Sequence, residues 1–168
     1  MSLTAPAGRQ QALSASVLAI GMAGVVGSAL LFEHVGGYIP CKLCLEQRLP
    51  YYIGAPVMLA AVLASTLRLP GIVTRGLILV GALLMTWGLW MGVYHSGVEW
   101  GWWAGPTDCG VVAGAPAGGS LLDSLNTVIP PSCDEAALRI LGLSLAGWNA
   151  IASLVLAAIA YRGAFARA

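Results

Sequence analysis

Charged residues are scarce in this chain of 168 residues. Asp, Glu, Lys and Arg make up 9% of the sequence, against about 25% in an ordinary soluble domain, whereas 58% of the residues are hydrophobic. This composition excludes a water-soluble globular protein. The net charge is only +1, so the chain also lacks the basic footprint that a nucleic-acid-binding protein shows.

The missing charge defines four segments. Residues 10–32, 49–67, 76–94 and 140–161 contain no Asp, Glu, Lys or Arg, and each is close to the length of about 20 residues that an apolar helix needs to cross a membrane. The first segment is too long for the core of a secretory signal peptide, which has about 7 to 15 residues. The sequence therefore predicts an all-α fold, an integral membrane four-helix bundle that forms one domain over residues 1–168.

The remaining charges are divided unequally between the two predicted faces of the membrane. The face that carries both termini has only basic residues, namely Arg9, Arg68, Arg75, Arg162 and Arg167. All acidic residues fall in the two loops of the other face, residues 33–48 and 95–139. Because Lys and Arg accumulate on the cytoplasmic side, we expect both termini in the cytoplasm and both loops outside.

All four cysteines lie in the two outer loops. The first loop contains Cys41 and Cys44, and the second contains Cys109 and Cys133. An oxidising compartment permits disulfides there. An even number of cysteines in this placement predicts two bridges, structural or redox-active, and four cysteines allow three pairings.

The tight pair Cys41 and Cys44 forms a C-x-x-C motif. A disulfide that closes a loop of roughly 15 residues stabilises a fold by about 3 kcal/mol, and one that closes so short a loop stabilises it by less. The C-x-x-C motif also lowers the pKa values of its thiols. Lys42 lies between the thiols, and Arg48 shares a face with Cys44 if the segment is helical. Pro50 disfavours helical geometry at the residue before it, which predicts a kink. This setting favours reversible redox chemistry.

Zinc binding and purely structural bridges are the alternatives for these cysteines. Zinc sites use closely spaced ligand pairs, but Cys109 and Cys133 are far apart in the sequence, and the only histidines are His34 and His95. Taken alone, Cys109 and Cys133 fit a structural loop bridge as well as a redox pair. The neighbouring C-x-x-C favours the redox interpretation, because thiol–disulfide exchange needs a second pair as its partner.

Two further features belong to the outer face. Apolar residues at helical spacing in residues 120–130 predict a short amphipathic helix that lies in the membrane interface or packs against helix ends. Aromatic residues around residues 87–103 are typical of the belt at a membrane–water interface. His95 lies among them and fits an interfacial polar residue, with a ligand role as the alternative.

Two stretches of the sequence resemble a known family. Residues 40–48 read Pro-Cys-Lys-Leu-Cys-Leu-Glu-Gln-Arg, and residues 94–109 read Tyr-His-Ser-Gly-Val-Glu-Trp-Gly-Trp-Trp-Ala-Gly-Pro-Thr-Asp-Cys. With the four spans and the second cysteine pair, they resemble the bacterial disulfide bond formation protein B (DsbB) family over essentially the whole chain. The resemblance implies an inner-membrane thiol:quinone oxidoreductase that reoxidises a periplasmic DsbA-like carrier and reduces ubiquinone or menaquinone. It also places His95 near the quinone site.

The resemblance implies a role for each remaining candidate residue. The reduced carrier would attack a bridge between Cys109 and Cys133 and form a mixed disulfide with Cys109. Cys133, released as a thiolate, would then attack Cys41. Cys44 would face the quinone, and Arg48 would hold the quinone or stabilise the Cys44 thiolate.

Other functions fit less of the sequence. A vitamin K epoxide reductase-like enzyme also combines four helices, a C-x-x-C and a quinone, but its C-x-x-C is expected late in the chain. A non-enzymatic membrane protein whose bridges only hold its loops is an alternative of a different class. A transporter is disfavoured because no Asp, Glu, Lys or Arg lies inside a predicted span, whereas ion pathways use such residues.

Overall fold

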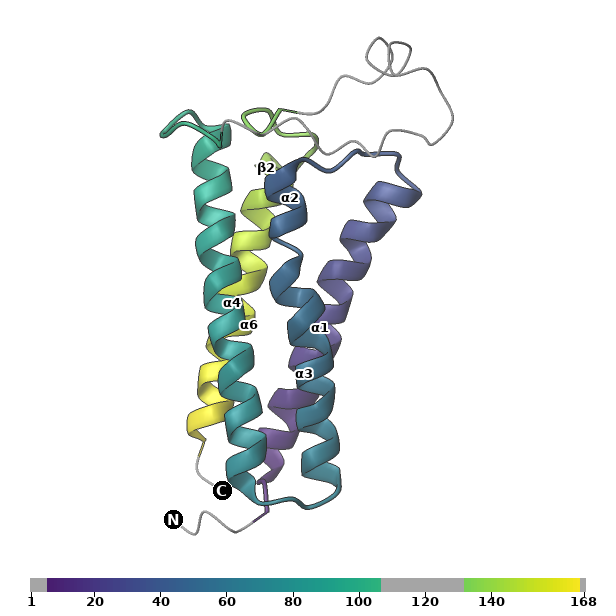
Figure 1. Ribbon diagram of the computed structural model, residues 1–168, viewed down its shortest axis with the longest axis vertical. Helices are drawn as coiled ribbons and strands as arrows, with labels where there is room; N and C mark the ends of the chain where they lie inside the picture. Colours follow the sequence, from purple (N-terminus) through teal and green to yellow (C-terminus); the bar gives the residue numbers. More distant parts are fainter. Residues whose placement is uncertain (1–5, 107–131, 167–168) are drawn as a thin grey trace.

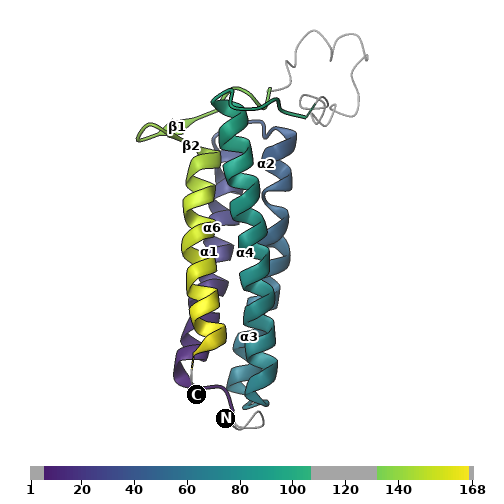
Figure 2. The same cartoon turned by 90° about the vertical axis from the view of Figure 1, so that its left-hand side faces the viewer.

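The computed structural model describes residues 6–106 and 132–166. Within these residues, four helical segments are long and apolar enough to cross a membrane, and they stand side by side as a bundle (Figures 1 and 2). They are α1 (Arg9–His34), α2 (Lys42–Glu46) continued by α3 (Leu49–Thr66), α4 (Gly71–Glu99) and α6 (Leu145–Phe165). The prediction of an all-α, four-helix membrane protein is confirmed.

The two ends of the bundle carry different parts of the chain. One end holds the beginning of α1, the turn between α3 and α4, and the end of α6 (Figure 1). There the side chains of Gln11 and Arg75 both donate hydrogen bonds to the backbone oxygen of Ala166, at 3.3 and 3.2 Å. These bonds join α1 and α4 to the end of α6. The opposite end holds the end of α1, the helix α2 and a short β-hairpin.

The bundle buries one set of apolar side chains between its helices and exposes another on its outer surface. Ala15, Leu18, Met22, Met58, Ile78 and Met85 are fully buried between the helices. Ile20 on α1 is 74% exposed, which would be costly in water but suits a surface that faces lipid tails. The exposed aromatic residues Trp90, Trp100 and Trp102 lie in and beyond the last third of α4, and their place in an interfacial belt stays a prediction.

Helices α4 and α6 approach each other closely because small residues face one another. A Cβ atom at Gly92 would lie 2.9 Å from the Cα and N atoms of Ala150, and one at Gly88 would lie 2.9 Å from Ser153 Oγ. Small residues allow such close backbone contact between helices in a membrane. The contact fixes α6 against the C-terminal half of α4, where the candidate site lies.

Two helices, α4 and α6, differ most from the charge-free segments. Helix α4 begins at Gly71 and ends at Glu99, so it continues beyond residues 76–94 at both ends and includes Arg75. Charge marks the limit of the apolar layer but does not end a helix, since a long cationic side chain can extend towards water.

Helix α6 begins at Leu145 rather than at residue 140, because a β-hairpin precedes it. Strand β1 (Arg139–Ile140) pairs antiparallel with β2 (Leu143–Ser144), and the two turn residues, Leu141 and Gly142, both have positive φ angles. Positive φ at both positions is typical of a tight hairpin turn. The Ser144 side chain then caps α6 by accepting a hydrogen bond from the backbone N–H of Gly147.

The segment that carries the C-x-x-C is interrupted as expected. Helix α2 ends at Glu46 and α3 begins at Leu49, with Pro50 in its first turn. Backbone N–H groups in the first turn of a helix have no partner within that helix, so a proline there, which lacks the N–H, costs α3 no hydrogen bond.

Three predictions concern residues that the structure does not describe. They are the amphipathic helix at 120–130, the position of Cys109 and the position of Arg167.

Candidate functional site

The two thiols of the C-x-x-C are adjacent at the start of α2. Cys41 is the residue that precedes the helix, and its Sγ accepts a hydrogen bond from the backbone N–H of Cys44 at 3.3 Å. The two Sγ atoms lie 2.8 Å apart, and both residues are free thiols. Cys41 is buried and Cys44 is half-buried, so the pair is largely removed from water.

The surroundings of Cys41 favour its thiolate form. The hydrogen bond from the Cys44 thiol is the main cause that lowers the pKa of Cys41 from 9.0 to about 5. Burial opposes this shift, and the His95 ring, with Nε2 at 3.8 Å from the Cys41 sulfur, adds to it. The sequence suggested Lys42 for this role, but its ammonium group lies 4.0 Å from the Glu46 carboxylate. Cys41 therefore has the pKa of a reactive thiol.

His95 reaches the thiols from α4, far along the chain. Its side chain is buried, and its Nδ1 atom lies 2.5 Å from Nε2 of Gln47. The sulfur atoms of Cys41 and Cys44 and a ring nitrogen of His95 all lie within 4.8 Å of one another. This is a donor set that zinc can use, and the sequence spacing did not reveal it because it brings in a residue from another helix.

A chain of polar side chains continues from His95 into the bundle. The Gln47 Oε1 atom accepts a hydrogen bond from Asn149 Nδ2 at 2.6 Å, and Asn149 Oδ1 accepts one from the Tyr51 hydroxyl at 2.6 Å. The Tyr51 hydroxyl also lies 2.7 Å from Ser153 Oγ. These bonds connect α3 and α6 to the residue that contacts Cys41.

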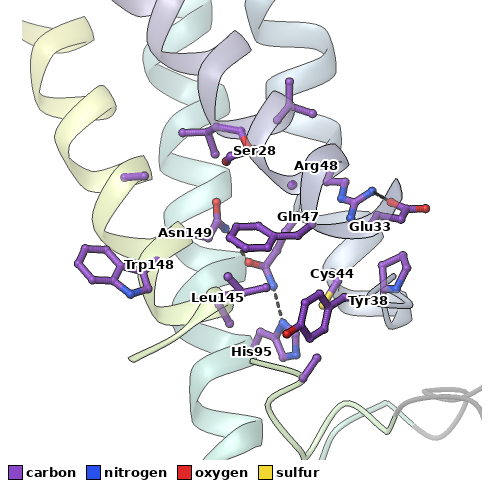
Figure 3. A pocket seen from close by; sticks show the side chains of 18 of the residues that line it. Ser28, Glu33, Tyr38, Cys44, Gln47, Arg48, His95, Leu145, Trp148 and Asn149 are labelled. Carbon is purple, nitrogen blue, oxygen red and sulfur yellow. Dashed lines mark hydrogen bonds and ion pairs between the residues drawn. The ribbon is translucent and has the colours of Figure 1, made fainter. Parts of the chain in front are cut away.

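A cavity of about 390 Å³ opens beside Cys44, among α1, the α2–α3 segment and α6 (Figure 3). One part of its wall is apolar and includes Val25, Val26, Ala29 and Phe32 of α1. The other part presents the polar side chains of Gln47, Arg48, His95 and Asn149 beside the Cys44 sulfur. Apolar walls with a few convergent polar groups are typical of sites for small molecules.

Arg48 lines this cavity together with an acidic partner. Its guanidinium forms an ion pair with the carboxylate of Glu33 near the end of α1 (Figure 3). The Arg48 side chain is 11% exposed and that of Glu33 is 28% exposed. The pair therefore fixes the direction of the guanidinium at the cavity and joins the start of α3 to α1.

Cys133 comes close to the tight pair, although it lies far away in the sequence. It is 1% exposed and belongs to one buried cluster with Cys41, Leu43, Met91 and Val98. Cys133 is disulfide-bonded, and neither Cys41 nor Cys44 is its partner, because both are free thiols. The structure thus gathers Cys41, Cys44 and Cys133, and Cys109 lies outside the described residues.

Four residues of the site were not predicted from the sequence, namely Glu33, Gln47, Glu99 and Asn149. Glu99 follows His95 by one helical turn, and its Oε1 atom lies 3.9 Å from His95 Nε2. That spacing was visible in the sequence and could have identified Glu99. Gln47 and Asn149 have no such signal, because each is a single neutral residue whose partner is on another helix.

Comparison with known proteins identifies the family of the chain. The family model described as "Disulfide bond formation protein DsbB" matches residues 11–162. The disulfide bond formation protein B 2 of Pseudomonas putida KT2440 is 31% identical over 148 residues, which cover 80% of this chain and 79% of that protein. The disulfide bond formation protein B of Hahella chejuensis is 28% identical, with 83% and 85% covered.

A third relative has no function in its name. It is an uncharacterized protein of Rickettsia prowazekii, 23% identical over 78% of this chain and 74% of its own length. No solved structure matches this chain at a significant level. The family match covers most of the chain and includes both thiols, Arg48, His95 and Cys133. The chain therefore belongs to the DsbB family and is a multi-pass membrane oxidoreductase of disulfide bond formation.

Proposed function

We propose that the protein is a thiol:quinone oxidoreductase that reoxidises a periplasmic DsbA-like dithiol carrier and passes the electrons to a membrane quinone. The observation that carries the proposal is the position of the tight pair. Cys44 lines an apolar cavity among the membrane helices, whereas Cys41 packs in one buried cluster with Cys133. Electrons can therefore enter the pair on one side and leave on the other.

The cavity has the composition that a quinone headgroup needs. The apolar wall from α1 suits a ring and its lipid-like tail, while Arg48 and Asn149 offer N–H donors for the ring oxygens. A quinone bound there would supply the oxidising power, because it takes up two electrons and two protons. We propose that Arg48, directed by its ion pair with Glu33, donates to a ring oxygen, and that His95 contacts the quinone as part of the cavity wall.

Thiol–disulfide exchange would deliver the electrons to the pair. The reduced carrier attacks a bridge between Cys109 and Cys133, forms a mixed disulfide with Cys109 and releases Cys133. The second thiol of the carrier then attacks its own sulfur in this mixed disulfide, so that the carrier leaves oxidised and Cys109 is released as a thiolate. Cys133 then attacks Cys41 of an oxidised Cys41–Cys44 pair, and Cys44 leaves. Attack of Cys109 on Cys133 restores the first bridge and releases Cys41 with the electron pair of the broken bond.

The environment of Cys41 suits its part in this sequence. Because its pKa is lowered to about 5, Cys41 leaves readily as a thiolate, and departure is faster for thiols of low pKa. The same thiolate can then form the bond to the Cys44 sulfur while two electrons leave through Cys44. Each turnover oxidises two thiols, and two protons accompany the two electrons to the acceptor.

The reduction potential of the carrier explains why a membrane-soluble oxidant is needed. DsbA has a reduction potential of about −120 mV, so few protein dithiols can oxidise it, and the bacterial periplasm is kept oxidising by the known relay of DsbA, DsbB and quinone. We propose the same place for this chain, in the bacterial inner membrane with α2 and the hairpin on the periplasmic side. The basic residues at the other end of the bundle support this orientation.

The proposal is tested with membranes that contain the protein and a reduced DsbA-like carrier. We expect reduction of added ubiquinone or menaquinone, and comparing the two identifies the acceptor. The Cys109→Ser, Cys133→Ser variant should lose activity with the carrier but keep it with a small dithiol that reaches Cys41 directly. Quinone reduction at the wild-type rate in a Cys41→Ser, Cys44→Ser variant would refute the proposal.

A further inference from the structure

His95 is held between a hydrogen-bond donor on one side and acceptors on the other. Nδ1 faces the Gln47 side-chain amide, whose Nε2 lies at 2.5 Å. Nε2 faces the Cys41 sulfur at 3.8 Å and the Glu99 carboxylate at 3.9 Å. A neutral imidazole has one N–H donor and one acceptor nitrogen, and its surroundings decide which nitrogen carries the proton.

The polarity of the Gln47 amide is set by its other partner. Gln47 Oε1 accepts the hydrogen bond from Asn149 Nδ2, so the Gln47 NH₂ group is the one directed at His95. Asn149 is oriented in turn by the Tyr51 hydroxyl, which donates to Asn149 Oδ1. Each donor in this chain meets an acceptor, and the last acceptor is Nδ1 of His95.

The groups on the other side of the His95 ring favour a proton on Nε2, which agrees with Nδ1 as the acceptor. The Cys41 thiolate accepts hydrogen bonds and cannot donate one. Glu99 is a buried acid with its side chain 4% exposed, and its Oε2 atom has no hydrogen-bond partner within the described residues. A bare nitrogen lone pair facing a thiolate and a buried carboxylate would be unfavourable, because buried acceptors need donors.

We infer that Gln47, held by Asn149, is a positioning residue that directs the Nε2–H group of His95 at the Cys41 thiolate. Only the consequence of this inference for turnover rests on the proposed function. When the bond between Cys133 and Cys41 breaks, the electron pair goes to the Cys41 sulfur, and the Nε2–H group stabilises that charge. No proton is transferred in this step.

The protonation state can be measured directly, since the chain has only two histidines. His34 on α1 is exposed and its Nδ1 lies 3.1 Å from a backbone carbonyl of its own helix, so His34→Gln leaves His95 as the single imidazole. The ¹⁵N NMR shifts of the reduced protein in detergent should show a protonated Nε2 and an unprotonated Nδ1 at neutral pH. A proton on Nδ1, alone or together with one on Nε2, would overturn the inference.

A Gln47→Leu variant tests the effect on the thiol. It removes the amide donor and keeps a side chain of similar size, and Gln10→Leu, at an exposed site on α1, is the matched control. Because the amide then no longer directs the Nε2–H group at the thiolate, we expect iodoacetamide labelling of Cys41 at pH 6 to slow about tenfold in Gln47→Leu and to stay unchanged in the control.

This labelling separates positioning from a merely structural role. A structural role would lower the unfolding temperature but leave the pH profile of Cys41 labelling in the folded protein where it is in wild type, and that result would contradict the inference. Neither the NMR nor the labelling uses a quinone or a carrier. Failure of the proposed function would therefore leave both measurements informative.

Discussion

At the residue scale, the site depends on an inequality between two neighbouring thiols, which differ in their surroundings and in their pKa values. Cys41 is buried beside His95 and next to Cys133, whereas Cys44 lines the cavity. Only Cys41 has a pKa lowered to about 5. One thiol is thus suited to exchange with another disulfide, and the other is suited to contact a small molecule.

This inequality predicts a particular pH dependence of thiol labelling. Because the pKa of Cys41 is lowered, its thiolate is present above about pH 5 and is lost as the pH falls below that value. Iodoacetamide labelling of Cys41, followed by peptide mass spectrometry, should have its midpoint near pH 5. Cys44→Ala removes the main cause and should move the midpoint towards the usual value of 9.0. An unchanged midpoint in this variant would contradict the assignment of the cause.

Arg48 gives a second prediction at this scale. If its guanidinium binds the quinone, Arg48→Gln should raise the KM for quinone about tenfold, since hydrogen bonds to charged groups contribute about 1.5–3 kcal/mol. Arg139→Gln, in the exposed strand β1, is the control and should keep the wild-type KM. A KM that changes equally in both variants would place Arg48 outside the binding site.

At the element scale, the sequence predicts what is local and misses what depends on another helix. Absence of charge identifies the four spans because every span must avoid charge along its own length. The C-x-x-C and Pro50 are equally local, and they predict the thiol pair and the break between α2 and α3. The pairing of Gln47 with Asn149 joins side chains 102 positions apart, so no local pattern contains it.

The hairpin and the ends of α4 were missed for related reasons. Strands β1 and β2 have two residues each, which is too short to show alternation. Leu141 adopts a positive φ angle, for which leucine gives no sequence signal. Arg75 lies inside α4 although the charge-free segment begins after it. Segment boundaries that were set by charge thus describe the apolar layer rather than the helix.

The contact between α4 and α6 predicts an unequal effect of two similar substitutions. Gly92→Ala places a Cβ atom 2.9 Å from the backbone of Ala150 and should destabilise the bundle by about 1–3 kcal/mol through overpacking. Gly76→Ala, on the same helix but facing open space, should be neutral or stabilising by up to about 1 kcal/mol. Thermal unfolding in detergent, followed by circular dichroism, measures both. Equal unfolding temperatures would show that α4 and α6 are not in close contact.

At the scale of the whole molecule, the arrangement of charge matches the arrangement of function. The thiol pair, the cavity and the hairpin lie towards one end of the bundle, and the turn with Arg68 and the helix ends with Arg9 and Arg162 lie at the other (Figure 1). The positive-inside rule assigns the basic end to the cytoplasm. In the proposed orientation, the thiols are on the oxidising side of the membrane.

This orientation is testable by labelling from outside. In a background with the four native cysteines replaced by serine, Leu141→Cys in the hairpin should react with a membrane-impermeant maleimide in intact spheroplasts. Leu67→Cys at the end of α3 should react only after lysis. Both positions are exposed, at 88% and 70%, so accessibility within the protein does not differ much between them. Labelling of Leu67→Cys before lysis would reverse the topology.

The central claim is that the Cys41–Cys44 dithiol passes its electrons directly to a quinone. It is tested most directly by mixing the reduced Cys109→Ser, Cys133→Ser variant with quinone, without carrier and without oxygen. We predict one quinol formed per chain, and one new disulfide, between Cys41 and Cys44, in the peptide mass spectrum. Thiols that stay free while quinone is present in excess, or quinol formed without that disulfide, would contradict the account.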